Sequence, residues 1–133
     1  MATILVIEDD LPVQRVLTRI LERAGHTVHT AGDGLAGVRV FREMRPDLVI
    51  TDLQMPEANG IEVILMLQAA APALPIIAMS GGEISQGLDL LTNAGLLGAI
   101  GLLPKPFSVP DLVSAVNAAM LPRPEADSGG AAC

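Results

Sequence analysis

The chain contains very few aromatic residues and a single cysteine. Its 133 residues include two phenylalanines, Phe41 and Phe107, with no tryptophan or tyrosine. Aliphatic side chains and methionine must therefore form the hydrophobic core, which a chain of this length can bury as one domain. Cys133 is the only cysteine, so an internal disulfide is excluded. We expect a free thiol in a reducing compartment, and hence a cytoplasmic protein.

Basic residues and long apolar runs are also scarce. Eight lysines and arginines stand against fifteen acidic residues, which gives a formal net charge of −7. Nucleic-acid binding needs a basic surface, so we expect no nucleic-acid partner. No apolar run approaches the roughly eighteen residues that span a bilayer, which excludes membrane insertion. No basic residue precedes the first apolar run, so the sequence also lacks the pattern of a secretory signal.

Short apolar runs alternate with segments whose apolar residues recur every three or four positions. This alternation is typical of strands followed by helices and favours an α/β fold with an open parallel sheet. Strands are predicted at 3–7, 26–31, 47–51, 75–79 and 99–103, and the strand at 26–31 alternates in a way that favours a position near an edge. Helices are predicted at 11–24, 34–44, 60–70, within 84–97, and at 110–120.

The first predicted helix has the clearest pattern. Asp10 is placed to cap its start and Gly25 to end it. Its apolar stripe consists of Val13, Val16, Leu17, Ile20, Leu21 and Ala24. In the second helix we expect Val38 and Phe41 to face inward. Residues 1–121 are predicted to form one domain, and the Pro-, Gly- and Ala-rich segment 122–133 a disordered tail.

Polar side chains follow several of the predicted strands. They are Glu8, Asp9, Asp10, Asp52, Ser80 and Lys105. Ligands of open parallel sheets bind at the carboxyl ends of the strands, so these side chains are expected to gather there. Neighbouring carboxylates repel, and a hard divalent ion such as Mg²⁺ would neutralise them. Lys105 and Ser80 suit the oxygens of a phosphoryl group, and Asp52 is the best candidate for the nucleophile that accepts it.

Four segments together resemble bacterial response-regulator receiver domains of the chemotaxis type. They are residues 4–10 (ILVIEDD), 52–56 (DLQMP) followed by Gly60, 79–81 (MSG) and 105–107 (KPF). The resemblance extends from about residue 2 to 121. It implies a flavodoxin-like (βα)5 doubly wound parallel sheet with the strand order 2-1-3-4-5.

The resemblance also implies a function and a set of site residues. Asp52 would be the phosphoacceptor, receiving a phosphoryl group from a histidine kinase or a histidine phosphotransfer protein. Mg²⁺, with Mn²⁺ as an alternative, would be bound by Asp9 and Asp52, by Glu8 through a water molecule, and by the backbone carbonyl of Gln54. No turnover of an external substrate is implied.

The remaining implied residues act on the phosphate. Ser80, Gly81 and Lys105 would contact it, and Pro106 is a candidate for a cis peptide bond. Movement of Ser80 would reshape the face formed by the fourth helix, fifth strand and fifth helix. That face would bind an unidentified target protein or a second copy of the chain. We therefore expect a single-domain regulator that signals by protein–protein contact or by onward phosphotransfer.

Three departures from the family pattern qualify these expectations. Leu102 stands where the family often has a switching aromatic residue, so another readout is needed. Ser80 and Lys105 are about three residues further apart than is usual. Gly81 and Gly82 directly follow the serine and offer no side chain to shield the phosphate, so we hypothesise that hydrolysis is not especially slow. An apolar surface patch or a broad core would explain the leucine-rich helices, which include Leu65, Met66, Leu90, Leu96 and Leu97.

Other functions are weaker interpretations. Residues 32–37 match the glycine pattern of dinucleotide-binding loops, but Asp33 would lie against an anionic pyrophosphate. A flavodoxin-like mononucleotide binder is disfavoured because the acidic loop at residues 8–10 repels phosphate unless a metal intervenes. A phosphatase with an aspartate nucleophile would need a second carboxylate as general acid at position 54, and Gln54 stands there, so this function is disfavoured. His26 and His29 are interpreted as surface residues. A phosphorylation-independent interaction module remains the alternative.

Overall fold

The computed structural model describes residues 2–53, 60–80, 101–104 and 106–120. Its elements are β1 (Thr3–Ile7), α1 (Leu11–Arg23), β2 (Thr27–Ala31), α2 (Gly34–Met44), β3 (Leu48–Asp52), α3 (Gly60–Ala70), β4 (Ile76–Ser80), β5 (Gly101–Pro104) and α5 (Val109–Ala119). The predicted helix within 84–97 and the predicted tail at 122–133 lie outside the described residues.

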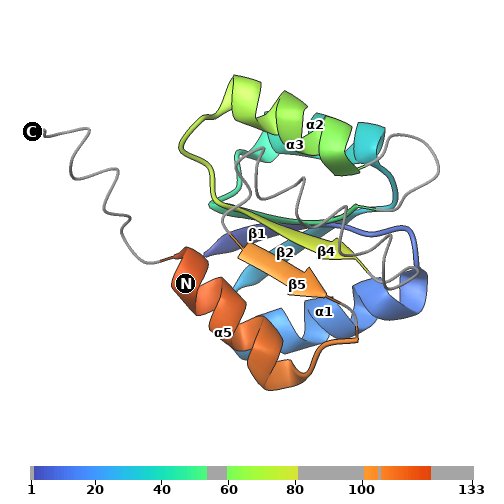
Figure 1. Ribbon diagram of the computed structural model, residues 1–133, viewed down its shortest axis with the longest axis vertical. Helices are drawn as coiled ribbons and strands as arrows, with labels where there is room; N and C mark the ends of the chain where they lie inside the picture. Colours follow the sequence, from blue (N-terminus) through green and yellow to red (C-terminus); the bar gives the residue numbers. More distant parts are fainter. Residues whose placement is uncertain (1, 54–59, 81–100, 105, 121–133) are drawn as a thin grey trace, which may run out of the picture.

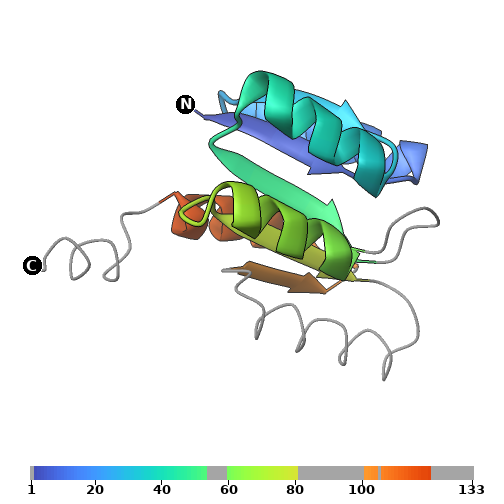
Figure 2. The same cartoon turned by 90° about the horizontal axis from the view of Figure 1, so that it is seen from above.

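The strands form one parallel sheet in the order β2-β1-β3-β4-β5. Helices α2 and α3 cover one face of this sheet, and α1 and α5 cover the other (Figure 1). Figure 2 shows the strands side by side, with the α2–α3 layer lying across them. The predicted doubly wound fold and its strand order are thereby confirmed. The edge position of β2 is confirmed as well, because most of its residues are exposed or half-buried.

The central strands are buried on both faces. Successive side chains of a strand point to opposite sides of the sheet. Accordingly, Leu5 and Val49 join the core beneath α2 and α3, whereas Ile4 and Ile50 join the core beneath α1 and α5. Every residue of β3 is buried. The continuous apolar runs of the sequence thus correspond to strands covered by helices on both sides.

Helix α1 begins and ends where the sequence predicts, within one residue. The carboxylate of Asp10 accepts a hydrogen bond from the Val13 amide at 3.3 Å, and Gly25 follows the helix with a φ of 97°. The predicted apolar stripe was wrong at two positions. Val16 is 55% exposed, and Ala24 is exposed just after the helix ends at Arg23. Their neighbours at 17 and 21 fill the space against the sheet instead.

Helix α2 explains the glycine pattern at residues 32–37. A Cβ atom on Gly37 would lie 2.7 Å from Cγ1 of Ile7 and closer still to Cδ1. This glycine therefore allows α2 to pack closely on β1. The carboxylate of Asp33 accepts a hydrogen bond from the Ala36 amide at 2.8 Å and caps the helix. An acidic cap occupies the position where a pyrophosphate would bind, which argues against a dinucleotide site.

The structure corrects the interpretation of His26. Its ring is half-buried, and its Nδ1 atom accepts a hydrogen bond from the backbone amide of Ala2 at 3.1 Å. The other histidine, His29, is exposed as predicted. Helix α5 begins at Val109, one residue before the predicted start. Ser108 and Asp111 form a reciprocal capping box that fixes this start.

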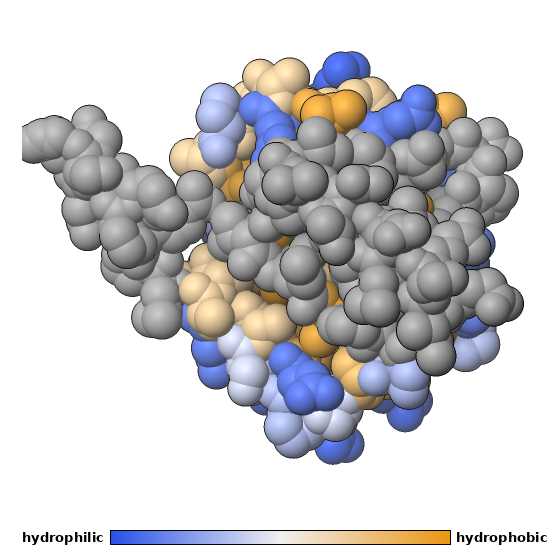
Figure 3. All heavy atoms as spheres, in the orientation of Figure 1, coloured by the Kyte–Doolittle hydropathy of each residue, from blue (hydrophilic) through white to orange (hydrophobic). Residues whose placement is uncertain are grey.

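Apolar side chains reach the surface on the α2–α3 layer (Figure 3). Leu35 is 53% exposed, Leu65 48% and Met66 38%. Two of the leucine-rich positions singled out in the sequence, Leu65 and Met66, therefore face outward. Leu90, Leu96 and Leu97 lie outside the described residues. Among the helices that the structure describes, none is long and apolar enough to cross a membrane.

Candidate functional site

Carboxylates converge at the carboxyl edge of the sheet. Glu8, Asp9 and Asp52 each place one carboxylate oxygen within 4.8 Å of the other two. Glu8 and Asp9 directly follow β1, and Asp52 is the last residue of β3. Among the described residues, this is the group of three acidic, histidine or cysteine side chains that is close enough to bind one metal ion.

Strand pairing explains this convergence. Strands β1 and β3 are neighbours, with Ile7 in register with Thr51. The residues that follow this pair, Glu8 and Asp52, therefore emerge side by side. On the other side of β3, Asp52 is in register with Met79, and the Leu53 amide donates a hydrogen bond to the Met79 carbonyl at 2.8 Å. The sheet itself fixes the backbone of both acidic residues.

Burial makes this arrangement electrostatically costly. Glu8 is fully buried, Asp52 is 4% exposed, and Asp9 is exposed. Two like charges about 4 Å apart repel by roughly 1 kcal/mol in water and by roughly 4 kcal/mol at an effective dielectric constant of 20. A bound divalent cation would turn this repulsion into attraction. Three carboxylates offer the hard oxygen ligands that Mg²⁺ prefers, so the donor set fits this ion.

Glu8 is further held by its backbone surroundings. Its amide donates a hydrogen bond to the Ala31 carbonyl at 3.0 Å, and its Oε2 atom accepts one from the Asp10 amide at 3.1 Å. The loop after β1 is thus joined both to β2 and to the start of α1. One carboxylate oxygen of Glu8 also lies within 4.8 Å of those of the other two acids.

The other predicted site residues are only partly described. Ser80 ends β4 and is in register with Pro104, the residue before Lys105. The end of β4 therefore lies beside that of β3, and the end of β5 follows on the other side of β4. Gln54, Gly81 and Lys105 lie outside the described residues. Pro106 is exposed and precedes the start of α5.

Gln14 was not among the site residues predicted from the sequence. Its side-chain amide donates hydrogen bonds to the carbonyls of Glu8 at 3.0 Å and Ala31 at 3.4 Å. Gln14 shares the inward face of α1 with Leu17 and Leu21, at spacings of three and seven residues. A polar residue on the inward face of a helix is the signal that predicts a half-buried hydrogen bond at such a position.

This fold and this site are those of a known class of signalling domain. The family described as the response regulator receiver domain matches residues 4–117. The chain therefore belongs to the response regulator receiver family. Receiver domains are the phosphoacceptor modules of two-component systems, in which they interact with histidine kinases and downstream targets.

Individual relatives agree with this assignment. The chain is 40% identical over 119 residues to the DNA-binding transcriptional regulator NtrC of Azospirillum brasilense, covering 90% of this chain and 24% of that protein. It is 35% identical over 130 residues to the response regulator MprA of Mycobacterium sp. (strain KMS), covering 95% of this chain and 53% of that protein. The chain thus spans a quarter to a half of these relatives.

Solved structures show the same fold. A receiver domain protein from Clostridium thermocellum superposes with a TM-score of 0.84 at 33% identity, covering 90% of this chain and 94% of that one. The predicted family and general function are confirmed. The relatives are regulators, and the DNA binding in the name of NtrC belongs to that longer protein.

Proposed function

We propose that Asp52 is the phosphoacceptor of this receiver domain and that Glu8, Asp9 and Asp52 bind Mg²⁺ beside it. The convergence of these three carboxylates at the carboxyl edge of the sheet carries the proposal. The backbone carbonyl of Gln54 would add a further oxygen ligand, and Glu8 would act through a bound water. Mn²⁺ has similar oxygen preferences and is the natural substitute.

The chemistry is a displacement at phosphorus. A carboxylate oxygen of Asp52 attacks the phosphorus of a phosphohistidine, and a new O–P bond forms while the P–N bond breaks. The electron pair of that bond returns to the imidazole nitrogen of the donor, which takes up a proton. Mg²⁺ held by Glu8, Asp9 and Asp52 would supply positive charge to stabilise the phosphoryl oxygens.

Four further residues would complete the phosphate site. Lys105 offers an ammonium group and Ser80 a hydroxyl, from the ends of two adjacent strands. Gly81 would leave room for the phosphate beside them, and Pro106 would set the direction of the loop through a cis peptide bond. Because Leu102 cannot act as an aromatic switch, we assign the signal to movement of Ser80 and to the face formed by the predicted fourth helix, β5 and α5.

The partners follow from this chemistry. The donor is a histidine kinase or a histidine phosphotransfer protein, and the output is a contact with a downstream protein, a second copy of the chain, or onward transfer of the phosphoryl group. We place this exchange in the cytoplasm. Gln54 stands where a phosphatase would need a second carboxylate, so turnover of external substrates is not expected.

Intact-mass measurement tests the proposal. The protein is incubated with Mg²⁺ and acetyl phosphate, beside an Asp52→Asn variant and an EDTA-treated sample. We expect one added phosphoryl group on the wild-type chain and a loss of at least about 100-fold in both controls. The Asp47→Asn variant changes an aspartate at the opposite edge of the sheet and should be phosphorylated normally.

Each failure has a distinct meaning. A phosphoryl group that persists in Asp52→Asn would move the acceptor to another residue. No addition to a folded protein that binds Mg²⁺ would favour the phosphorylation-independent interaction module. Folded protein that is phosphorylated equally well in EDTA would remove the metal from the proposal.

A further inference from the structure

Gln14 joins the ends of two strands beside the acidic site. It lies in the first turn and a half of α1, and its side-chain nitrogen Nε2 is 3.0 Å from the Glu8 carbonyl oxygen. The same nitrogen is 3.4 Å from the Ala31 carbonyl oxygen. A primary amide carries two N–H donors, so one side chain can serve both carbonyls.

The Glu8 carbonyl is a sensitive place for such a bond. It belongs to the peptide unit that links Glu8 to Asp9, and a peptide unit is planar. Fixing the direction of this carbonyl therefore also fixes the direction of the Asp9 amide and limits where the Asp9 side chain can point. Glu8 and Asp9 are two of the three acids whose oxygens converge within 4.8 Å.

We propose that Gln14 is a positioning residue for the metal site: its amide holds the Glu8–Asp9 peptide so that both carboxylates face Asp52. The inference rests on the proposed function, because it assigns the residue that orients the proposed Mg²⁺ ligands. Gln14 does not itself bind the ion. Its neutral amide adds no charge of its own to the acidic loop, so its effect is one of geometry.

Like charges make this positioning necessary. Without a bound cation, the carboxylates of Glu8, Asp9 and Asp52 repel one another. The exposed Asp9 is the member that can most easily turn away. A hydrogen bond to its peptide unit opposes a turn of the backbone that carries this side chain and keeps the site ready before the ion arrives. Replacing a residue that hydrogen-bonds to a metal ligand and orients it typically weakens metal affinity 10- to 100-fold.

The test compares two matched variants of α1. Gln14→Met keeps the length and helix propensity of the side chain but removes both donors. Thr18→Val is the control, because Thr18 also loses a side-chain hydrogen bond, the one from Oγ1 to the Gln14 carbonyl at 2.8 Å, without touching the acidic loop. Calorimetric titration with Mg²⁺ measures affinity, and urea denaturation measures stability separately.

We expect Gln14→Met to bind Mg²⁺ about 10-fold more weakly, while Thr18→Val stays within about twofold of wild type. The metal-free protein gives a second readout. The ¹³C chemical shifts of the Glu8 and Ala31 carbonyls should move in Gln14→Met and not in Thr18→Val. Unchanged Mg²⁺ affinity in Gln14→Met would leave Gln14 with a purely structural role and overturn the inference.

A Gln14→Glu variant separates geometry from charge and decides the question even where Gln14→Met does not fold. An added carboxylate strengthens cation binding by charge alone, whereas the lost donors weaken it. Weaker binding than wild type supports the positioning role, and equal or tighter binding contradicts it. Failure of the wild-type protein to bind Mg²⁺ would contradict the proposed function and this inference together. Normal Mg²⁺ affinity in both Gln14 variants would contradict the inference alone.

Discussion

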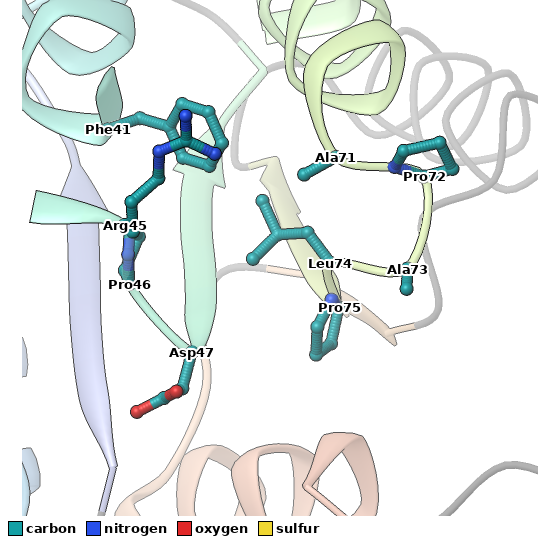
Figure 4. Close-up of a pocket in the computed structure, with 9 residues that line it drawn as sticks. All are labelled: Phe41, Arg45, Pro46, Asp47, Ala71, Pro72, Ala73, Leu74 and Pro75. Atoms are coloured by element: carbon teal, nitrogen blue, oxygen red, sulfur yellow. The ribbon is translucent and has the colours of Figure 1, made fainter.

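The two edges of the sheet collect opposite kinds of side chain. At the carboxyl edge, three acids converge after β1 and β3. At the amino edge, a pocket of about 390 Å³ opens between the end of α2 and the loop from α3 to β4 (Figure 4). The residues that line it are Phe41, Arg45, Pro46, Asp47, Ala71, Pro72, Ala73, Leu74 and Pro75. Most of these are apolar, and the two charged ones have opposite signs.

The same residue type has different effects at the two edges. Asp47 accepts a hydrogen bond from the Thr3 amide at 2.9 Å through Oδ2, and its own amide donates to the Thr3 carbonyl at 2.8 Å. This aspartate ties β1 to the start of β3. Asp9, by contrast, stands within reach of two other carboxylates. Asp47 thus forms hydrogen bonds that hold two strands together, whereas the acids at the carboxyl edge lie close enough to bind one metal ion.

The largest expected effect is the gain in the free energy of unfolding when Mg²⁺ binds at the carboxyl edge. A ligand that binds only the folded state at 100 times its Kd raises the free energy of unfolding by about 2.7 kcal/mol. We expect this gain in the wild-type protein and in Asp47→Ala, and its near-complete loss in Asp52→Asn. Urea denaturation with and without Mg²⁺, at matched ionic strength, measures it. An equal gain in Asp52→Asn would place the ion elsewhere.

Removing one aspartate from each edge gives the sharpest comparison. Asp47→Ala should lower the free energy of unfolding by about 1 kcal/mol, because the Thr3 amide loses its acceptor. Asp9→Ala should raise the stability of the metal-free protein, because it relieves repulsion from Glu8 and Asp52. Denaturation in EDTA gives both values.

The same two variants should differ in Mg²⁺ affinity in the opposite sense, with the loss in Asp9→Ala. Asp9→Ala is expected to weaken Mg²⁺ binding at least about 10-fold, which corresponds to about 1.4 kcal/mol, and Asp47→Ala to leave it unchanged. The distinction between the edges would be contradicted if Asp9→Ala and Asp47→Ala were both destabilised, or if both bound Mg²⁺ with normal affinity.

The acidic edge could be predicted from the sequence because it depends on short-range patterns. The apolar runs ending at Ile7 and Ile50 predict buried strands, and a parallel sheet brings the residues after them to one edge. Glu8, Asp9 and Asp52 were identified on that basis, and the structure brings them together. The contribution of Ser80, Gln54 and Lys105 to the site stays a prediction.

The features that escaped prediction depend on contacts between distant segments. Val16 and Leu17 are adjacent apolar residues, and only the packing of α1 on the sheet decides that Leu17 is buried and Val16 exposed. The bonds of Gln14 reach Ala31, seventeen residues away, and His26 accepts its bond from Ala2, which directly precedes the neighbouring strand β1. A helical or strand period carries no information about such partners.

The amino edge contains one backbone feature that offers a smaller test. Arg45, which caps the end of α2, is the described non-glycine residue with a positive φ, at 53°. Its guanidinium carbon lies 5.8 Å from the centre of the Phe41 ring, and Figure 4 shows the two side chains together at the pocket. A non-glycine residue in the left-handed region costs about 1–2 kcal/mol relative to glycine. An exposed cation–π contact such as that of Arg45 with Phe41 stabilises the protein by about 0.5–1 kcal/mol.

Two substitutions separate these contributions. Arg45→Ala loses the ring contact and keeps the strained backbone, whereas Arg45→Gly loses the same contact and relieves the strain. We therefore expect the glycine variant to be more stable than the alanine variant by about 1 kcal/mol, the reverse of their order inside a helix. Urea denaturation measures the difference, and Mg²⁺ affinity should be the same in both variants. An alanine variant as stable as the glycine one would mean that residue 45 does not hold its left-handed conformation in solution.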